Sequence, residues 1–422
     1  MMQAIINGRL VLSNKILDGG ALLFDKKIIG VVSRETLDAA WKNERAWKGE
    51  SLVLTDAQGA YVSPGFINLH IHGCAGADTM DDKEDALAMM SDFLVKTGVT
   101  SFLPTTMTYD LPTVYKALER IRESMTVMIR RREEQHKAAN ALQFDDSQPV
   151  HTKRLRGAKA LGAYLEGPFI SGAYKGAQKK EYISVADFKK IESFADVIKV
   201  VVLAPETLPS ESLNEFIAQC RAHNIIVSLG HSAAGYDEAM QAVKAGASHV
   251  THLCNAMTGL HHRNPGLLGA ALDSGVTCEL IADDLHVHPA VQRLLYHCKS
   301  AAELELITDS MRACGLPAGV SELGGQTVYV KNGAARLKDE TLAGSIVTMN
   351  QAMANFSRNT GASVPEVVRM VTENQAQELG LFEKIGSLSP GAAADIAIFN
   401  ENFTVYRTFV DGQEVYRNSE FG

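Results

Sequence analysis

Eight short apolar segments alternate with longer amphipathic stretches between residues 66 and 309. The apolar segments are 66–72, 99–105, 160–166, 197–203, 225–230, 248–252, 277–283 and 304–309. Amphipathic stretches such as 83–96 and 111–131 lie between them. Strands that alternate with helices favour a parallel sheet, and eight such units match a closed barrel. The sequence therefore predicts an α/β fold with a (β/α)8 TIM-like barrel.

Both ends of the chain show a different pattern. Short strand-like segments at 4–6, 10–12, 21–24 and 28–32 are separated by polar and glycine turns. Residues 395–399 alternate in hydrophobicity, and 405–416 form a hairpin pattern around Asp411-Gly412. We expect a small β-sandwich domain built from residues 1–62 and 387–422, around a barrel of residues 63–386. The polar segment 130–159 is predicted to contain the end of a long helix followed by a loop.

Composition narrows the class of protein. The chain of 422 residues is 46% hydrophobic and 21% charged, which is typical of a soluble globular protein. Its net charge of -8 argues against a nucleic-acid surface. No apolar stretch approaches the roughly 20 residues that span a bilayer, and the first residues lack a secretory signal pattern. Six scattered cysteines without CxxC spacing predict reduced thiols and a cytoplasmic location.

Polar residues end several of the apolar segments. They are His70 and His72, Glu166, His231, His252 and Asp309. Residues i and i+2 of a strand share a face, so His70 and His72 can hold one ion together. The carboxyl ends of barrel strands meet at one mouth, where imidazole and carboxylate ligands suit zinc or a similar divalent ion. His249 lies three residues before His252, and we expect it to face the other way and pack against a helix.

Longer motifs resemble one family within the amidohydrolase superfamily. They are Pro64-Gly65-Phe66-Ile67, Glu166-Gly167-Pro168-Phe169, Gly230-His231-Ser232, Thr251-His252-Leu253-Cys254-Asn255-Ala256-Met257, His286-Val287-His288-Pro289, Thr308-Asp309-Ser310-Met311 and Leu342-Ala343-Gly344-Ser345. Together they resemble the N-acetylglucosamine-6-phosphate deacetylase family over essentially the whole chain. The resemblance implies a metal-dependent hydrolase that releases acetate from N-acetyl-D-glucosamine 6-phosphate in amino-sugar catabolism or recycling.

The resemblance also implies roles at the metal site. Glu166, His231 and His252 are expected to be the main metal ligands, and Asp309 the catalytic acid and base. The His70 and His72 pair allows a second ion, with Glu166 bridging. The implied cofactor is one or two divalent ions per subunit, with zinc favoured over iron, manganese or cobalt.

Further residues match the substrate-binding positions of the family. The expected contacts to the sugar, the acetyl group and the phosphate are Ala177, Gln178, Asn255, Ala256, Arg263, His286, Leu342, Ala343 and Gly344. Arg263 and His286 are expected to hold the 6-phosphate, and in relatives this histidine comes from the neighbouring subunit. The resemblance therefore implies a homodimer that shares active-site residues, with a small phosphosugar as its partner.

The sequence departs from the family at two positions and leaves other functions open. The family usually has Asp where Asn68 stands, and Asp284 replaces a common glycine before Leu285-His286. Without a carboxylate at position 68, the second metal site lacks its usual nearby charge. Another amidohydrolase, acting on a different N-acyl sugar or a cyclic amide, is one alternative. A non-catalytic barrel that serves as an assembly protein is the other.

Overall fold

Eight parallel strands form the centre of the computed structural model, which describes residues 2–33, 35–37, 52–83, 85–141 and 157–420 (of 127–141 the backbone alone). The strands are β8 (Phe66–Ile71), β11 (Val99–Thr106), β13 (Ala163–Leu165), β14 (Ile198–Leu203), β15 (Ile226–Leu229), β16 (His249–Val250), β17 (Thr277–Ile281) and β18 (Leu304–Ile307). Each pairs in parallel with the next. A bridge between Ile71 and Ser310 joins the end of the first strand to the segment that follows the last. The predicted barrel is confirmed.

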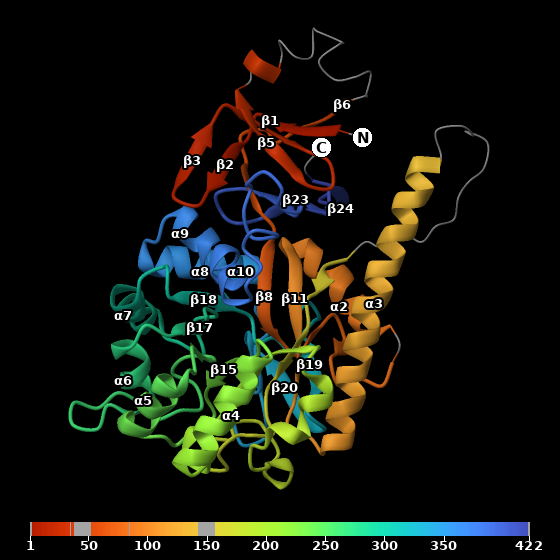
Figure 1. The fold of residues 1–422 in the computed structure, drawn as a ribbon. Helices are drawn as coiled ribbons and strands as arrows, with labels where there is room; N and C mark the ends of the chain where they lie inside the picture. Colours follow the sequence, from red (N-terminus) through yellow and green to blue (C-terminus); the bar gives the residue numbers. More distant parts are fainter. Residues whose placement is uncertain (1, 34, 38–51, 84, 142–156, 421–422) are drawn as a thin grey trace.

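Helices cover the outside of the barrel (Figure 1). They are α2 (Ala86–Leu94), α3 (Leu111–Ala141), α4 (Ser210–Ala222), α5 (Tyr236–Ala245), α6 (Gly266–Asp273), α7 (Pro289–Lys299), α8 (Met349–Thr360), α9 (Val364–Arg369) and α10 (Glu373–Glu378). After β13, three short 3-10 turns replace a helix: Lys180–Tyr182, Phe188–Lys190 and Glu192–Phe194. The long helix expected before residue 159 is α3, whereas the loop expected after it falls on 142–156, outside the described residues.

Two further sheets are built from the chain ends, as the sequence predicts. One has the order β5-β4-β1-β6 and the other β24-β23-β22-β7-β2-β3. Their strands are β1 (Met2–Ile6), β2 (Arg9–Leu12), β3 (Lys15–Asp18), β4 (Gly20–Phe24), β5 (Ile28–Ser33), β6 (Leu52–Asp56), β7 (Tyr61–Pro64), β22 (Ile396–Phe399), β23 (Val405–Val410) and β24 (Gln413–Arg417). Phe24 and Phe409 meet at 5.6 Å between ring centroids, so the two termini share one small core. The domain boundaries at 62/63 and 386/387 remain predictions.

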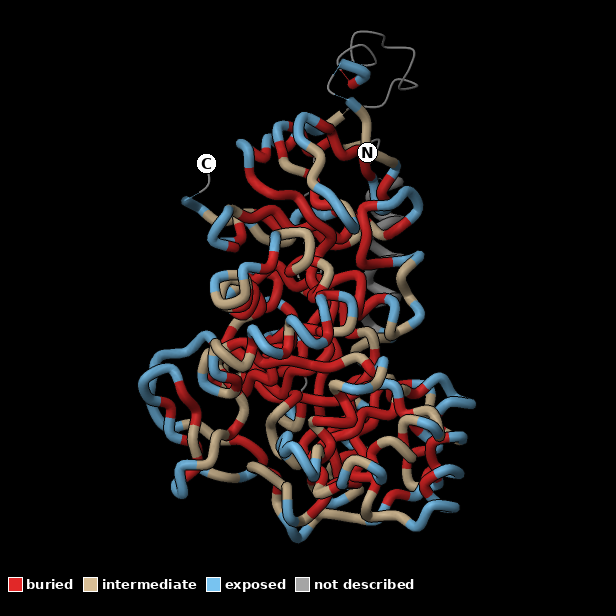
Figure 2. Tube along the Cα trace, turned by 90° about the vertical axis from the view of Figure 1, so that its left-hand side faces the viewer, coloured by how far each residue is buried: buried red, intermediate tan, exposed pale blue. Residues whose placement is uncertain are grey.

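A three-stranded insertion follows the last barrel strand and is absent from the sequence-based prediction. It comprises β19 (Gly319–Leu323), β20 (Gln326–Lys331) and β21 (Ala334–Arg336). Smaller strands are β9 (Gly73–Cys74), β10 (Ala77–Asp78) and β12 (Lys159–Ala160). The insertion and the terminal sheets lie at opposite ends of the molecule (Figure 1). Buried residues run through the middle of the barrel (Figure 2). Among the described helices, none has the length and apolar character to cross a membrane.

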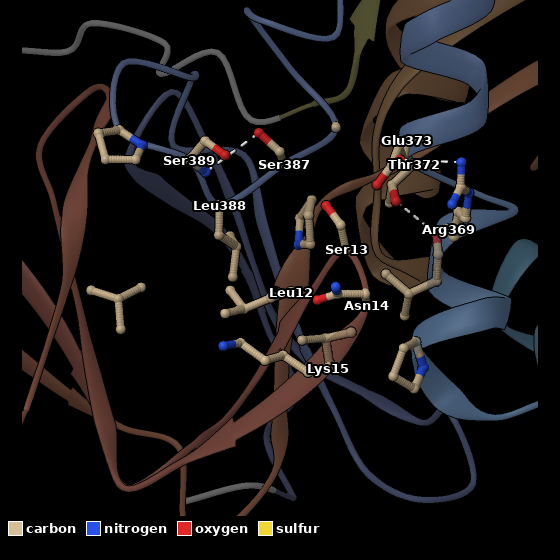
Figure 3. A pocket seen from close by; sticks show the side chains of 17 residues that line it. Leu12, Ser13, Asn14, Lys15, Arg369, Thr372, Glu373, Ser387, Leu388 and Ser389 are labelled. Atoms are coloured by element: carbon tan, nitrogen blue, oxygen red, sulfur yellow. Dashed lines mark hydrogen bonds and ion pairs between the residues drawn. The ribbon is translucent and has the colours of Figure 1, made fainter.

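One cavity lies where the terminal sheets meet the barrel (Figure 3). It has a volume of about 340 Å³ and is lined by the turn after β2, by α9 and by residues 386–390. Lys15 and Arg369 both line it, but neither of the two groups of metal-ligating side chains found among the described residues does. The two groups of candidate metal ligands instead face a smaller cavity at the barrel mouth.

A buried lysine joins the barrel side of the molecule to the terminal sheet. The Nζ atom of Lys159, on β12, lies 2.5 Å from Asp395 Oδ2 and 2.9 Å from Asp411 Oδ1.

Lys159→Met would leave two neighbouring carboxylates without this counter-charge, and breaking such a buried pair typically costs about 3–5 kcal/mol. We expect the urea midpoint of unfolding to fall accordingly. Lys96→Met, at an exposed lysine, should change stability by less than about 0.5 kcal/mol. Equal midpoints in the two variants would contradict this role of Lys159.

Candidate metal centre and active site

The candidate ligands lie where barrel strands end. His70 is in β8 and His72 follows it, whereas Glu166 follows β13 and Asp309 follows β18. His231, His252 and Asp309 have φ values of 45°, 30° and 45°, in the left-handed region that non-glycine residues seldom adopt. Such backbone conformations cluster at functional sites, where the surrounding structure maintains them. Here each chain segment turns out of its strand and directs the side chain into the barrel mouth.

The first ligand group consists of Glu166, His231 and His252. Glu166 Oε1 lies 3.1 Å from the Nε2 atoms of both histidines, and these two nitrogens lie 3.1 Å apart. All three side chains are buried. Three nitrogen and oxygen atoms this close to one another form a typical ligand set for a divalent ion.

The second group consists of His70, His72 and Asp309, all buried. Asp309 Oδ1 lies 3.2 Å from His72 Nε2 and 3.5 Å from His70 Nε2. Glu166 reaches this group too, because its Oε2 lies 3.2 Å from His72 Nε2. His70 Nε2 and Asp309 Oδ1 are buried without a hydrogen-bond partner, although buried polar atoms are nearly always paired. A bound cation would provide the missing partner for both His70 Nε2 and Asp309 Oδ1. These residues therefore fit one or two divalent ions.

The two carboxylates of the centre are ionised. Burial alone would raise the pKa of Glu166, but the charges of His231 and His72 and hydrogen bonds from His231 and His252 hold it well below its ordinary value. Burial likewise acts against Asp309, and His70 and His72 keep its pKa below the ordinary value. Asp309 is therefore able to accept a proton.

A cavity of about 210 Å³ opens onto both ligand groups. Of the predicted substrate-binding residues, seven line it: Ala177, Gln178, Asn255, Ala256, His286, Leu342 and Gly344. Ala343 is fully buried and is not among the lining residues. Sequence reasoning missed Met107, Gly176, Leu323 and Thr341, which also line the cavity. Leu323 comes from the insertion, whose position the sequence pattern did not indicate.

The two residues expected to hold a phosphate are placed differently. His286 lines the cavity of its own chain, and its Nδ1 lies 2.7 Å from Asp283 Oδ2. Arg263 is exposed, is not among the lining residues, and has its Nη1 atom 2.7 Å from His262 Nε2. The resemblance implies that His286 serves the site of a neighbouring subunit, whereas the structure places it in the cavity of its own chain. A homodimer that shares active-site residues remains a prediction.

Gln178 contacts the metal centre directly. Its side-chain amide donates to Glu166 Oε2, and its Oε1 accepts from the backbone N–H of Thr108 at 2.8 Å. It therefore fixes the orientation of the carboxylate that lies between the two ligand groups. The sequence indicated Gln178 as a sugar contact and gave no sign of this second contact.

The prediction that His249 packs against a helix is wrong. His249 is fully buried, with its Nδ1 atom 2.9 Å from Ser228 Oγ and its Nε2 atom 3.4 Å from Glu305 Oε2. Ser228 and Glu305 belong to barrel strands β15 and β18, so the imidazole points into the barrel. Because β16 ends at Val250, counting alternate residues as far as His252 extends the strand beyond its real length.

The carboxylate expected near the second group is supplied from another strand. Asn68 donates to Thr308 Oγ1 at 2.8 Å, deep in the barrel. Glu279, on β17, lies 3.0 Å from His70 Nδ1 instead. Burial would raise the pKa of Glu279, but the charge and hydrogen bond of His70 bring it to about 2. The sequence indicated this contact of Glu279 only by placing a glutamate inside an otherwise apolar strand.

A (β/α)8 barrel with histidine and carboxylate groups at the carboxyl ends of its strands defines a metal-dependent hydrolase class. A model of the amidohydrolase family matches residues 61–415. The chain therefore belongs to the amidohydrolase family.

Comparison with named proteins shows which members of the family the chain resembles. The chain is 38% identical over 416 residues to an N-acetylglucosamine-6-phosphate deacetylase of Bacillus subtilis (strain 168), covering 97% of this chain and 96% of that one. It is 35% identical to an N-acetylgalactosamine-6-phosphate deacetylase of Escherichia coli O157:H7, over 85% of this chain and 89% of the relative. The crystal structure of N-acetylglucosamine-6-phosphate deacetylase from Pasteurella multocida superposes with a TM-score of 0.85 at 31% identity, covering 99% of this chain and all of that one.

Metal analysis of two variants tests the ligand groups separately. His252→Ala should remove the ion of the first group, because water does not replace one of three protein ligands at similar affinity. His70→Ala should lower the metal count from two per chain to one. Elemental analysis of the purified proteins measures both, with His223→Ala at an exposed histidine as the control. Full metal content in His252→Ala would refute the assignment of the first group.

Proposed function

We propose that this protein hydrolyses the acetamide of N-acetylglucosamine 6-phosphate to glucosamine 6-phosphate and acetate. The names of relatives that match nearly the full chain support this substrate. The observation that carries the proposal is the single cavity at the barrel mouth, in which both ligand groups meet the amide side chains of Gln178 and Asn255 and the imidazole of His286. Such a cavity combines a metal centre with polar contacts for a sugar and an anion.

Glu166, His231 and His252 would hold a divalent ion, with zinc favoured over iron, manganese or cobalt, and His70, His72 and Asp309 a second one. When bound, the ion polarises the acetyl carbonyl and lowers the pKa of water beside it. Asp309 accepts the proton of the attacking water and delivers it to the amine nitrogen that leaves. Its Oδ1 faces the histidine pair, and we propose Oδ2 as the atom that carries the proton.

The remaining cavity residues would orient the substrate. Leu342, Ala343 and Gly344 form the segment proposed to pack on the acetyl group, whereas Ala177, Gln178, Asn255 and Ala256 contact the sugar. His286, held by Asp283, binds the 6-phosphate by a charge-assisted hydrogen bond. Fixing the phosphate places the amide against the metal centre and lowers the entropic cost of reaction.

Arg263 would complete the phosphate site from a second copy of the chain. It is exposed on the loop before α6 and does not line the cavity of its own chain. We therefore propose a homodimer in which each arginine reaches the partner's cavity, across a two-fold axis that makes both sites equivalent. Six free cysteines in the chain support a reducing, cytoplasmic compartment.

The Escherichia coli relative makes N-acetylgalactosamine 6-phosphate the second candidate substrate. Acetate release by the metal-loaded protein, measured with both phosphorylated sugars and with unphosphorylated N-acetylglucosamine, separates the candidates. We expect N-acetylglucosamine 6-phosphate to have the highest kcat/KM and the unphosphorylated sugar the lowest. Activity on none of the three would refute the proposal and favour a cyclic amide substrate or a non-catalytic barrel.

Asp309→Asn tests the proton transfer. Asparagine has a similar size but cannot accept and return a proton, and general acid–base catalysis typically contributes about 10²–10⁴-fold. We expect kcat to fall by at least that factor while the ion of the first ligand group is retained, as elemental analysis would show. A near-normal kcat would remove Asp309 from this role.

Arg263→Ala tests the phosphate contact. Hydrogen bonds of charged groups contribute about 1.5–3 kcal/mol, so kcat/KM for the phosphorylated sugar should fall roughly ten- to a few-hundred-fold. The unphosphorylated sugar should be little affected, and Arg417→Ala, at an exposed arginine of β24, should change neither. Equal losses on both sugars would assign Arg263 a structural role.

Mixing Asp309→Asn chains with Arg263→Ala chains should restore activity if the site is shared, since one of the two sites in a mixed dimer is then intact.

A further inference from the structure

The four histidines of the two ligand groups differ in what their Nδ1 atoms contact. Three lie against backbone carbonyl oxygens: His72 against Thr105 at 3.3 Å, His231 against Tyr174 at 2.9 Å and His252 against Asn255 at 3.1 Å. His70 alone lies against a carboxylate, Glu279 Oε2, at 3.0 Å. A hydrogen bond at Nδ1 fixes the proton there and leaves the lone pair of Nε2 for a metal.

Glu279 contacts more than His70. Its Oε2 also accepts hydrogen bonds from Thr251 Oγ1 at 2.7 Å and from the backbone N–H of His252 at 3.1 Å. The side chain is fully buried on β17. A single carboxylate oxygen therefore connects His70 of the second ligand group to the backbone of His252 in the first.

This contact has a direct consequence for His70. With its Nδ1 proton donated to Glu279, the imidazole presents Nε2 at 3.5 Å from both Glu166 Oε1 and Asp309 Oδ1. That Nε2 is the buried nitrogen without a hydrogen-bond partner. A carboxylate acceptor makes the imidazole a stronger ligand than a carbonyl acceptor does, and such partners typically contribute about 10–100-fold in metal affinity or activity.

We propose that Glu279 is the positioning residue that enables the His70–His72–Asp309 group to bind the second metal ion. It supplies from β17 a negative charge that the neutral amide of Asn68 cannot supply, and Asn68 itself donates to Thr308. Glu279 does not contact the substrate cavity, so it acts through His70. The inference rests on the proposed metal centre and deepens it.

Glu305 provides a matched control. It lies on the neighbouring strand β18 in direct register with Glu279, and both side chains are fully buried. Its Oε2 lies 3.4 Å from His249 Nε2, and His249 belongs to neither ligand group. Glu305→Gln therefore removes an equally buried carboxyl group without touching a candidate ligand.

The test is the metal content and metal affinity of Glu279→Gln and Glu305→Gln, measured on the full chain with Mn²⁺ or Zn²⁺ against a competing chelator. We expect the wild type and Glu305→Gln to bind two ions per chain. Glu279→Gln should bind the first ion normally and the second about 10–100-fold more weakly. Adding Glu279→Gln to His70→Ala should change nothing further, which a general loss of stability would not reproduce.

Three results would overturn the proposal: unchanged affinity for the second ion in Glu279→Gln, an equal loss in Glu305→Gln, or a wild type that binds one ion only. If Glu279→Gln does not fold, Glu279→Asp gives the same readout, because the shorter side chain withdraws the carboxylate from His70 by one methylene. Metal binding is measured without substrate. A wild type that binds two ions and releases no acetate would refute the proposed function and leave this inference intact.

Discussion

The carboxylate of Glu166 is the group on which the arrangement of the barrel mouth depends. Its two oxygens lie within 3.1–3.5 Å of nitrogens from four histidines, which come from three different strand ends. Burying one carboxylate among four imidazoles is costly unless charge is balanced and every polar atom is paired. A divalent ion satisfies both conditions, so the geometry of the protein and the need for a metal follow from the same electrostatic constraint.

The barrel interior beneath this centre is more polar than an ordinary core. His249, Glu279 and Glu305 are fully buried on adjacent strands, and each has a polar partner. The two glutamates nevertheless differ: burial raises the pKa of Glu305 to about 7, whereas the contacts of Glu279 with His70 bring its pKa to about 2. The charged glutamate is the one that lies against a candidate metal ligand. The contacts of Glu279 with His70 and His252 are the basis for treating it as part of the metal centre, whereas Glu305 contacts His249 and belongs to the core.

Much of the fold follows from local sequence patterns. Seven of the eight barrel strands lie within the predicted segments, and β11 extends one residue beyond its segment. The Asp411-Gly412 turn joins β23 to β24 with positive φ at both residues. The convergence of His70, His72, Glu166, His231, His252 and Asp309 followed from one rule, that parallel strands bring their carboxyl ends together.

What the sequence did not reveal depends on contacts between distant segments. The position of the insertion beside the cavity, the hydrogen bond from Gln178 to Glu166 and the contact of Glu279 with His70 join residues that no periodicity connects. His249 was misplaced because β16 has only two residues, so the alternation of faces stops before His252. A side chain's strand face can be predicted only where the strand continues.

The most direct measurement is anomalous X-ray diffraction from crystals of the metal-loaded protein. We expect two anomalous peaks on either side of the Glu166 carboxylate, one coordinated by His231 and His252 and the other by His70, His72 and Asp309. In the same map, His70 Nδ1 should remain hydrogen-bonded to Glu279. A peak outside these two groups, or none beside Glu166, would show that these residues do not form a metal centre.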